Sequence, residues 1–377
     1  MASQESRGQD PLARLIRPHL LRMAGYQPIR PVEAVSEEEG RPAADIVKLD
    51  GNENPYGCSP RVRQALAEFP WYHLYPDPEQ SRLRTALARY MGLGPENIVA
   101  GAGSDEIIDL LLRLTLEPGD AVVDCVPTFG MYRFSTELCG GRSVAVPRRA
   151  DYGLDVPAVK RALGGAKAVF IASPNNPTGN LSPQAEIEEL LRSGALVVVD
   201  EAYQEFSGET VAPLVARYRN LVVLRTFSKW AGLAGLRVGY GAMAPELAAR
   251  LMHIKSPYNV NAAAEVAALA ALEDGAHLRK VVQLIVAERE RLFKELARLP
   301  FLTVYPSRAN FLLCRVAGVG PSAEGVHAAL RRRGVLLRHF NTPYVKDCLR
   351  VSVGRPEDTD RLLTALRQAW EECRAGA

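Results

Sequence analysis

Short apolar runs alternate with segments of helical periodicity from about residue 95 onward. The apolar runs predict strands, and the periodic segments predict helices at 107–116, 129–138 and 184–192. Strands that are apolar at nearly every position, separated by helices, are typical of a mostly parallel sheet covered on both faces. The pattern therefore predicts an α/β fold whose ligand would bind beyond the carboxyl ends of the strands. The predicted strands are 97–100, 121–124, 168–172, 196–200 and 221–224.

The pattern changes after the turn at 257–261, where an alanine-rich helical stretch leads to a long charged helix. The remaining residues are typical of a smaller α+β domain, with predicted strands at 303–305, 311–313, 335–337 and 349–353 and helices at 278–299, 323–333 and the C-terminal end. A chain of 377 residues exceeds the size of one ordinary hydrophobic core. We therefore predict an N-terminal arm with the start of the small domain at 1–46, a large domain at 47–262 and a small C-terminal domain at 263–377.

Composition and charge are those of an ordinary globular protein, with 47% hydrophobic residues, 24% charged residues and a net charge of +3. Because charges of both signs are interspersed, neither a nucleic acid nor a membrane is an expected partner. The six cysteines are scattered without a Cys-x-x-Cys pair, so we expect no metal site and no disulfides, and a reducing compartment, the cytoplasm, fits best. The apolar stretch 12–23 is broken by Pro18 and predicts a docking arm helix, although its arginines leave organelle targeting open.

One lysine, Lys229, lies among hydroxyl-bearing, small and apolar residues in the segment 225–237. Its primary amine can condense with the aldehyde of pyridoxal 5'-phosphate. Thr226, Ser228 and Arg237 can bind the phosphate of the same cofactor through two hydroxyl groups and a guanidinium. A surface lysine after a strand is far commoner for any single lysine, but these neighbours favour the cofactor site.

A second anion site is indicated at 101–106, which follows a predicted strand and opens a predicted helix. The free backbone amides around Gly103, Ser104 and Asp105 would face a phosphate there. A dinucleotide-binding fingerprint is the alternative, but a glutamate occupies its third glycine position. A monophosphate cradle fits this segment equally well, and Lys229 favours it.

Polar residues also close two other predicted strands. Asp200 ends a buried strand, where a carboxylate is costly unless it meets a cation such as the protonated ring nitrogen of the cofactor, and a capping aspartate is the alternative. Tyr203 and Asn176, the latter in the proline-rich turn 173–179, can each donate a hydrogen bond to the phenolate oxygen of that ring. Phe129 can stack on the ring, with core packing nearly as favoured.

In their order and spacing, these residues resemble the fold type I pyridoxal phosphate aminotransferases, and within them the histidinol-phosphate aminotransferase family. The resemblance spans nearly the whole chain and implies a large domain that binds the cofactor and a smaller α+β domain. Two departures are Phe129, where a tyrosine is frequent, and the bulky Trp230 directly after the lysine. The motifs that carry the resemblance are 49–55, 75–76, 173–179, 200–203, 225–237, 257–259 and 348–354.

The resemblance also implies roles that the residues alone do not show. It implies a homodimer with shared active sites, in which Tyr75 of one subunit reaches the cofactor phosphate of the other. Tyr26 matches a hydroxyl that the partner subunit places near the substrate phosphate. Asn52 matches a substrate-binding position, and Arg338 and Arg350 match two substrate-binding arginines.

The implied reaction is a transamination in which Lys229 carries the proton between substrate and cofactor, with Asp200 and Tyr203 as further catalytic residues. The implied donor is L-histidinol phosphate and the implied acceptor is 2-oxoglutarate, giving imidazole-acetol phosphate and L-glutamate in histidine biosynthesis. A threonine-phosphate decarboxylase or an aromatic amino acid aminotransferase could use the same scaffold. A cofactor-binding regulator without turnover is an alternative from another class, but it would need a DNA-binding domain that the short polar start does not provide.

Overall fold

The largest element of the computed structural model, which describes residues 11–316 and 320–375, is a seven-stranded sheet. Its strand order is β2-β8-β7-β6-β5-β3-β4, and β8 runs in the opposite direction to the other strands of this sheet. The mostly parallel α/β fold predicted from the sequence is therefore confirmed. The strands are Ile98–Gly101 (β2), Ala121–Val126 (β3), Arg142–Pro147 (β4), Ala168–Ala172 (β5), Leu196–Asp200 (β6), Leu221–Thr226 (β7) and Gly239–Met243 (β8).

Helices cover both faces of this sheet, because its central strands place apolar side chains alternately on one face and the other. On one face, Val122 of β3 belongs to the same apolar cluster as Ile108 of α4. On the other face, Val123 of β3 clusters with Leu190 of α7. The helices of this part of the chain are α2 (Pro60–Glu68), α3 (Ser81–Met91), α4 (Ser104–Thr115), α5 (Met131–Leu138), α6 (Val156–Leu163), α7 (Gln184–Leu191), α8 (Gln204–Ser207), α9 (Pro245–Ile254) and α10 (Ala262–Glu273).

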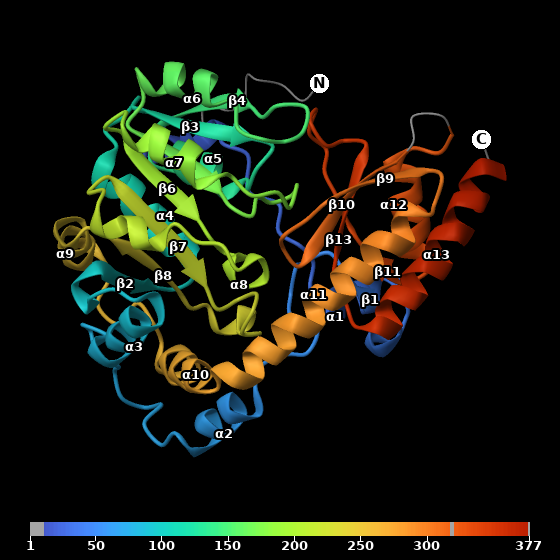
Figure 1. The fold of residues 1–377 in the computed structure, drawn as a ribbon, viewed down its shortest axis with the longest axis horizontal. Helices are drawn as coiled ribbons and strands as arrows, with labels where there is room; N and C mark the ends of the chain where they lie inside the picture. Colours follow the sequence, from blue (N-terminus) through green and yellow to red (C-terminus); the bar gives the residue numbers. More distant parts are fainter. Residues whose placement is uncertain (1–10, 317–319, 376–377) are drawn as a thin grey trace.

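A smaller antiparallel sheet, with the order β12-β13-β10-β9, lies beside the large one. Figure 1 shows the long helix α11 running diagonally from the large sheet to this small sheet, which also carries α12 and α13. The smaller α+β part of the prediction is therefore confirmed as well. Its elements are α11 (Gly275–Ala297), β9 (Leu302–Tyr305), β10 (Phe311–Val316), α12 (Ala323–Arg332), β12 (Arg338–His339), β13 (Cys348–Ser352) and α13 (Pro356–Ala375).

A separate parallel pair joins β1 (Val47–Lys48) to β11 (Val335–Leu336). The chain leaves this pair through Leu49, whose carbonyl accepts a hydrogen bond of 2.9 Å from the backbone of Ser352 in β13. Residues just after β1 are thereby held against the small sheet before the chain enters the large one. The predicted division at residues 47 and 262 remains a prediction.

The N-terminal arm differs from the helix predicted over 12–23. It has two short 3-10 turns, Pro11–Arg14 (η2) and Leu20–Arg22 (η3), on either side of Pro18. Proline lacks an N–H group and keeps the preceding residue out of the helical conformation, so a continuous helix is interrupted here. The arm does dock, since Arg17 donates to the carbonyl oxygen of Cys139 at 3.5 Å.

The segment between the arm and β1 contains α1 (Val32–Glu39). No helix in the described parts of the chain is long and apolar enough to cross a membrane. Other short 3-10 turns are η4 (Ala43–Asp45), η5 (Pro95–Asn97), η6 (Ala212–Ala216) and η7 (Ala234–Leu236).

Candidate active site

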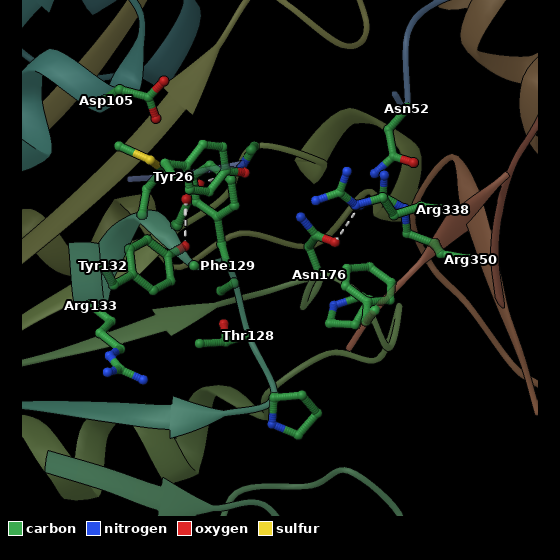
Figure 2. Close-up of a pocket in the computed structure, with 18 of the residues that line it drawn as sticks. Tyr26, Asn52, Asp105, Thr128, Phe129, Tyr132, Arg133, Asn176, Arg338 and Arg350 are labelled. Atoms are coloured by element: carbon green, nitrogen blue, oxygen red, sulfur yellow. Dashed lines mark hydrogen bonds between the residues drawn. The ribbon is translucent and has the colours of Figure 1, made fainter. Parts of the chain in front are cut away.

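A cavity of about 1110 Å³ opens at the carboxyl ends of the strands of the large sheet, next to β12 and β13 (Figure 2). Asp200 at the end of β6 and Thr226 at the end of β7 both line it. The structure thus brings together all but two of the residues predicted from the sequence. Those in the cavity wall are Tyr26, Asn52, Ser104, Asp105, Phe129, Asn176, Asp200, Tyr203, Thr226, Ser228, Lys229, Arg237, Arg338 and Arg350.

Lys229 lies in the loop after β7, and its Nζ donates a hydrogen bond of 2.9 Å to the carbonyl oxygen of Gly51. Burial, followed by the positive charge of Arg350, lowers the pKa of this amine to about 8. The loop is packed tightly against the segment that follows β1. Gly232, in a left-handed conformation with φ +70°, lies so close to the backbone of Gly57 that a Cβ would come within 2.4 Å of it.

Asp200 is almost fully buried and accepts two hydrogen bonds. The hydroxyl of Tyr132 donates to Oδ2 at 2.6 Å, and the backbone N–H of Ala202 donates to Oδ1 at 3.0 Å. Burial raises the pKa of Asp200 to about 6, and these two donors act against that rise. A strand-end carboxylate held this way is ready to meet a cation in the cavity.

Tyr203 and Asn52 form a buried pair in which Nδ2 of Asn52 donates to the Tyr203 hydroxyl oxygen at 3.0 Å. Asn52 adopts φ +54°, a conformation uncommon outside glycine, and Ser352 fixes it through two hydrogen bonds of 2.8 Å. Burial raises the pKa of Tyr203, so its hydroxyl keeps a proton to donate. We call Asp200, Tyr203 and Lys229 the lysine end of the cavity.

Arg350 points from β13 toward the lysine end. Its Nη1 donates to Oδ1 of Asn176 at 2.7 Å, its Nη2 donates to the carbonyl of Asp50, and its Nε has no hydrogen-bond partner among the described residues. The guanidinium lies over the rings of Phe311 and Phe340 at 5.5 and 5.7 Å. A buried cation in the cavity wall is suited to an anionic ligand.

Arg338 lies directly opposite Arg350 in the register of β12 and β13, and Figure 2 shows the two side chains close together. It is half-buried, donates to the carbonyl of Gln27 at 3.2 Å and lies 5.7 Å from the centre of the Phe340 ring. Tyr26 lines the same region. We call Tyr26, Arg338 and Arg350 the arginine end of the cavity.

Tyr26 lines the cavity of its own chain, whereas the resemblance implied a hydroxyl from a partner subunit. The arm runs past α5, and the Tyr26 ring contacts Phe134 of that helix edge to face at 6.2 Å. Burial raises the pKa of its hydroxyl, while Arg338 and Arg350 act in the opposite direction. The docked arm therefore supplies this hydroxyl in cis.

The predicted phosphate ligands gather where α4 begins. Gly101 of β2 and Thr226 of β7 both pair with Gly239 of β8, which brings the start of α4 beside the end of β7. The Thr226 hydroxyl donates to Ser228 Oγ at 2.9 Å. Arg237, in a left-handed conformation with φ +54°, donates to Asp105 at 3.1 Å. Conformations of this kind in non-glycine residues concentrate at functional sites.

Two predicted residues do not line the cavity. Gly103 lies just behind it as the N-cap of α4, with φ +82°, and a Cβ there would come within 2.5 Å of Nη2 of Arg237. Tyr75 is 82% exposed and stacks on Tyr258 at 4.6 Å. Its predicted contact with a partner's cofactor phosphate remains a prediction.

The two departures from the family pattern have simple packing. Phe129 is half-buried, lines the cavity and contacts Tyr132 edge to face at 5.6 Å. Trp230 points away from the cavity, where its ring stacks on Tyr90 at 5.6 Å, and its carbonyl accepts a hydrogen bond of 2.8 Å from Asn54. The bulky ring thus anchors the lysine loop without entering the site.

Sequence reasoning missed several residues of the cavity wall. Tyr132 is the most important, because it holds Asp200. Tyr132 stands three residues after Phe129 in the sequence, but the carboxylate that it contacts, that of Asp200, is 68 residues further along the chain. Asp124 and Arg133 line a further part of the cavity on the side of Tyr132 opposite Arg350, as Figure 2 shows for Arg133.

Comparison with known proteins identifies the family. The model of the class I and II aminotransferases matches residues 44–366. The chain is 52% identical over 362 residues to the histidinol-phosphate aminotransferase of Roseiflexus castenholzii, covering 94% of this chain and 98% of that one. It is 49% identical over 358 residues to a chloroplastic histidinol-phosphate aminotransferase of Arabidopsis thaliana, covering 94% and 86%.

A solved structure leads to the same family. The fold superposes with a TM-score of 0.87 and 28% identity on the histidinol-phosphate aminotransferase of Sinorhizobium meliloti in complex with pyridoxal 5'-phosphate, covering 95% of this chain and 98% of that one. The family resemblance seen in the sequence is therefore confirmed. The chain belongs to the class I and II aminotransferases, and within them to the histidinol-phosphate aminotransferase family.

Proposed function

We propose that this chain is a pyridoxal 5'-phosphate-dependent enzyme that transfers the amino group of L-histidinol phosphate to 2-oxoglutarate. The products are imidazole-acetol phosphate and L-glutamate, as in histidine biosynthesis. The observation that carries the proposal is the meeting of Lys229 and Asp200 with two guanidinium groups in one cavity, in a chain about half identical to relatives named for this activity.

The residues around the start of α4 fit the phosphate of the cofactor. Gly103 has no capping side chain, so the first backbone N–H groups of α4 are available to an anion. Because Gly103 also lacks a Cβ, Arg237 can approach this helix end closely. The hydroxyl groups of Thr226 and Ser228 and the backbone of Ser104 complete a phosphate site of suitable chemistry.

The residues of the lysine end fit the pyridoxal ring of the cofactor and the proton transfer that transamination requires. When bound, the cofactor supplies an electron sink for the carbon that loses its proton. Lys229 provides the amine that holds the cofactor and then moves the proton at Nζ, and a pKa of about 8 leaves part of this amine neutral near neutral pH. Asp200 holds the proton on the ring nitrogen through its carboxylate.

Hydrogen-bond directions prepare two donors for the phenolate oxygen of the ring. Asn52 donates to the Tyr203 oxygen, which leaves the hydroxyl proton of Tyr203 free to be donated. Arg350 donates to Oδ1 of Asn176, which leaves Nδ2 of Asn176 as the donor. Phe129 lines the cavity with a ring that can stack on the cofactor.

The arginine end fits the anion of the substrate. Arg350, Arg338 and Tyr26 line the same region of the cavity. A phosphate dianion can engage more donors than a carboxylate, so both arginines suit histidinol phosphate. Glutamate presents a single carboxylate, for which Arg350 suffices.

We also propose a homodimer with shared sites, located in the cytoplasm. The stretch around Tyr75 is unusually exposed for apolar side chains, since Trp71, Tyr72 and Leu74 are each more than half exposed. Mixing Tyr75→Phe protein with Lys229→Ala protein should produce heterodimers with one unmutated site and activity above that of either parent. A chain that is monomeric at working concentration would rule this out.

The reaction is tested by mixing the purified holoenzyme separately with histidinol phosphate, phenylalanine and threonine phosphate. Histidinol phosphate should convert the cofactor to its amine form without release of carbon dioxide, and 2-oxoglutarate should reverse the change. Faster conversion by phenylalanine would favour an aromatic aminotransferase. Carbon dioxide from threonine phosphate would favour the decarboxylase.

A further inference from the structure

Tyr132 is the side chain that holds the carboxylate of Asp200 in place. Its hydroxyl donates to Oδ2 at 2.6 Å, while Oδ1 is held by the backbone N–H of Ala202 at 3.0 Å. The backbone donor is fixed by the chain and would be present with any residue at position 132. The orientation of the carboxylate about its last bond therefore depends on the Tyr132 hydroxyl.

The ring of Tyr132 is itself fixed. It is 1% exposed and stacks on Phe170 of β5 at 4.8 Å with an angle of 11°. Phe129 contacts it edge to face at 5.6 Å. Tyr132 lies in the first turn of α5 and Phe129 lies just before this helix, so one short stretch of chain reaches both the face of the proposed ring and the carboxylate at its edge.

The ring contacts do not explain the hydroxyl. A phenylalanine would make the same stacking and edge contacts with Phe170 and Phe129. A fully buried hydroxyl without an acceptor would cost stability, so Asp200 is what accounts for a tyrosine here.

The charges favour this direction of the hydrogen bond. Burial raises the pKa of Tyr132 well above its ordinary value, so the hydroxyl remains a donor over the working range of pH. Burial also raises the pKa of Asp200 to about 6, and the bond from Tyr132 opposes that rise. Removing the bond would raise the proton affinity of Asp200 further.

We propose that Tyr132 is a positioning residue: its hydroxyl keeps Asp200 ionised and turned so that the carboxylate meets the ring nitrogen of pyridoxal 5'-phosphate. The proposal rests on the cofactor assigned under the proposed function. It does not depend on which amino donor the enzyme uses.

The test is the substitution Tyr132→Phe, read out without any amino donor. The dissociation constant of the cofactor should rise about ten- to a hundredfold, the range for loss of one charge-assisted hydrogen bond. The absorbance of the holoenzyme should also change its pH dependence. With donor present, kcat should fall while KM stays nearly constant.

The matched control is Tyr152→Phe, which removes another buried hydroxyl, one that accepts from Arg315 at 3.3 Å and lies outside the cavity wall. It should leave cofactor affinity and spectrum unchanged. The melting temperature of each apoprotein reports whether the fold is intact.

A double-mutant cycle separates positioning from packing. In an Asp200→Asn background, Tyr132→Phe should cost much less cofactor affinity than in the unmodified chain, because the charged acceptor is gone. Equal losses in both backgrounds, or an unchanged cofactor affinity and spectrum in Tyr132→Phe, would overturn the assignment. Failure of histidinol phosphate as a donor would overturn the proposed function and leave the Tyr132 result standing.

Discussion

At the lysine end of the cavity, Asp200 ends β6 and Lys229 lies in the loop after the adjacent parallel strand β7, so a single sheet brings the two together. At the arginine end, Tyr26, Arg338 and Arg350 come from the docked arm and from two strands of the other sheet. At the lysine end, Asp200 and Tyr203 are buried and Lys229 is half-buried, whereas Tyr26 of the arginine end is exposed and Arg338 is half-buried. The lysine end is thus suited to chemistry common to the superfamily, and the arginine end to the choice of substrate.

The largest expected effect is at the lysine end. Lys229→Ala should leave a folded protein that binds the cofactor weakly, while transamination falls by at least about 10²- to 10⁴-fold because the proton carrier is lost. Borohydride reduction of the wild-type holoenzyme followed by peptide mapping should label Lys229. A label on another lysine would show that Lys229 does not bind the cofactor, and the lysine end would then not be the site of the chemistry.

Arg350 borders both ends, so its loss should damage both half-reactions. Arg350→Ala removes a buried cation that also holds Asn176 and the carbonyl of Asp50. We expect roughly hundredfold lower kcat/KM with histidinol phosphate and with glutamate alike. Pre-steady-state measurement of each half-reaction gives the two values. Damage confined to one half-reaction would show that the two anions do not share this contact.

Arg338 should affect the two half-reactions unequally. Loss of one charge-assisted bond in Arg338→Ala should lower the specificity for histidinol phosphate about ten- to a hundredfold and spare the glutamate half-reaction. Pre-steady-state measurement of each half-reaction, as for Arg350→Ala, tests this difference. Equal losses would mean that Arg338 does not recognise the phosphate, and an aromatic donor would become the better candidate.

The pKa of Lys229 predicts a pH dependence for cofactor capture by the apoprotein. Its folded value of about 8 lies below the ordinary lysine value of 10.5, so the neutral amine increases as pH rises through 8 and then levels off. The association rate should rise roughly tenfold between pH 7 and pH 9. Stopped-flow absorbance gives this rate, and a rate still climbing steeply above pH 9 would mean that burial does not perturb the amine.

Much of the fold could be predicted because its central strands are continuous apolar runs. The strands that were missed carry weaker signals. β8 contains Gly239 and Gly241, and glycine is unfavourable in strands, yet a Cβ at Gly239 would come within 2.4 Å of the Ser104 backbone nitrogen. The glycines that weaken the strand signal of β8 in the sequence also leave the space that α4 needs beside this strand.

The candidate site shows a similar division. Lys229, Asp200 and Asn176 stand in short contiguous motifs, so their roles could be predicted from local pattern and resemblance. The roles of Tyr26 and Tyr132 depend on how distant segments dock. The cis placement of Tyr26 and the bond from Tyr132 to Asp200 therefore became visible only in three dimensions.

The smallest expected effect concerns Phe129, at a position where the family resemblance implies a tyrosine. If the lysine end uses the face of this ring, Phe129→Tyr should change cofactor affinity and kcat by no more than about threefold, since both rings can stack. Phe129→Leu keeps an apolar side chain but removes the aromatic face, and it should weaken cofactor binding by up to about tenfold. Equilibrium titration of both apoproteins with the cofactor measures the difference. Leu and Tyr variants with the same affinity as the parent would show that Phe129 only packs against Tyr132, and the lysine end would then depend on its polar residues alone.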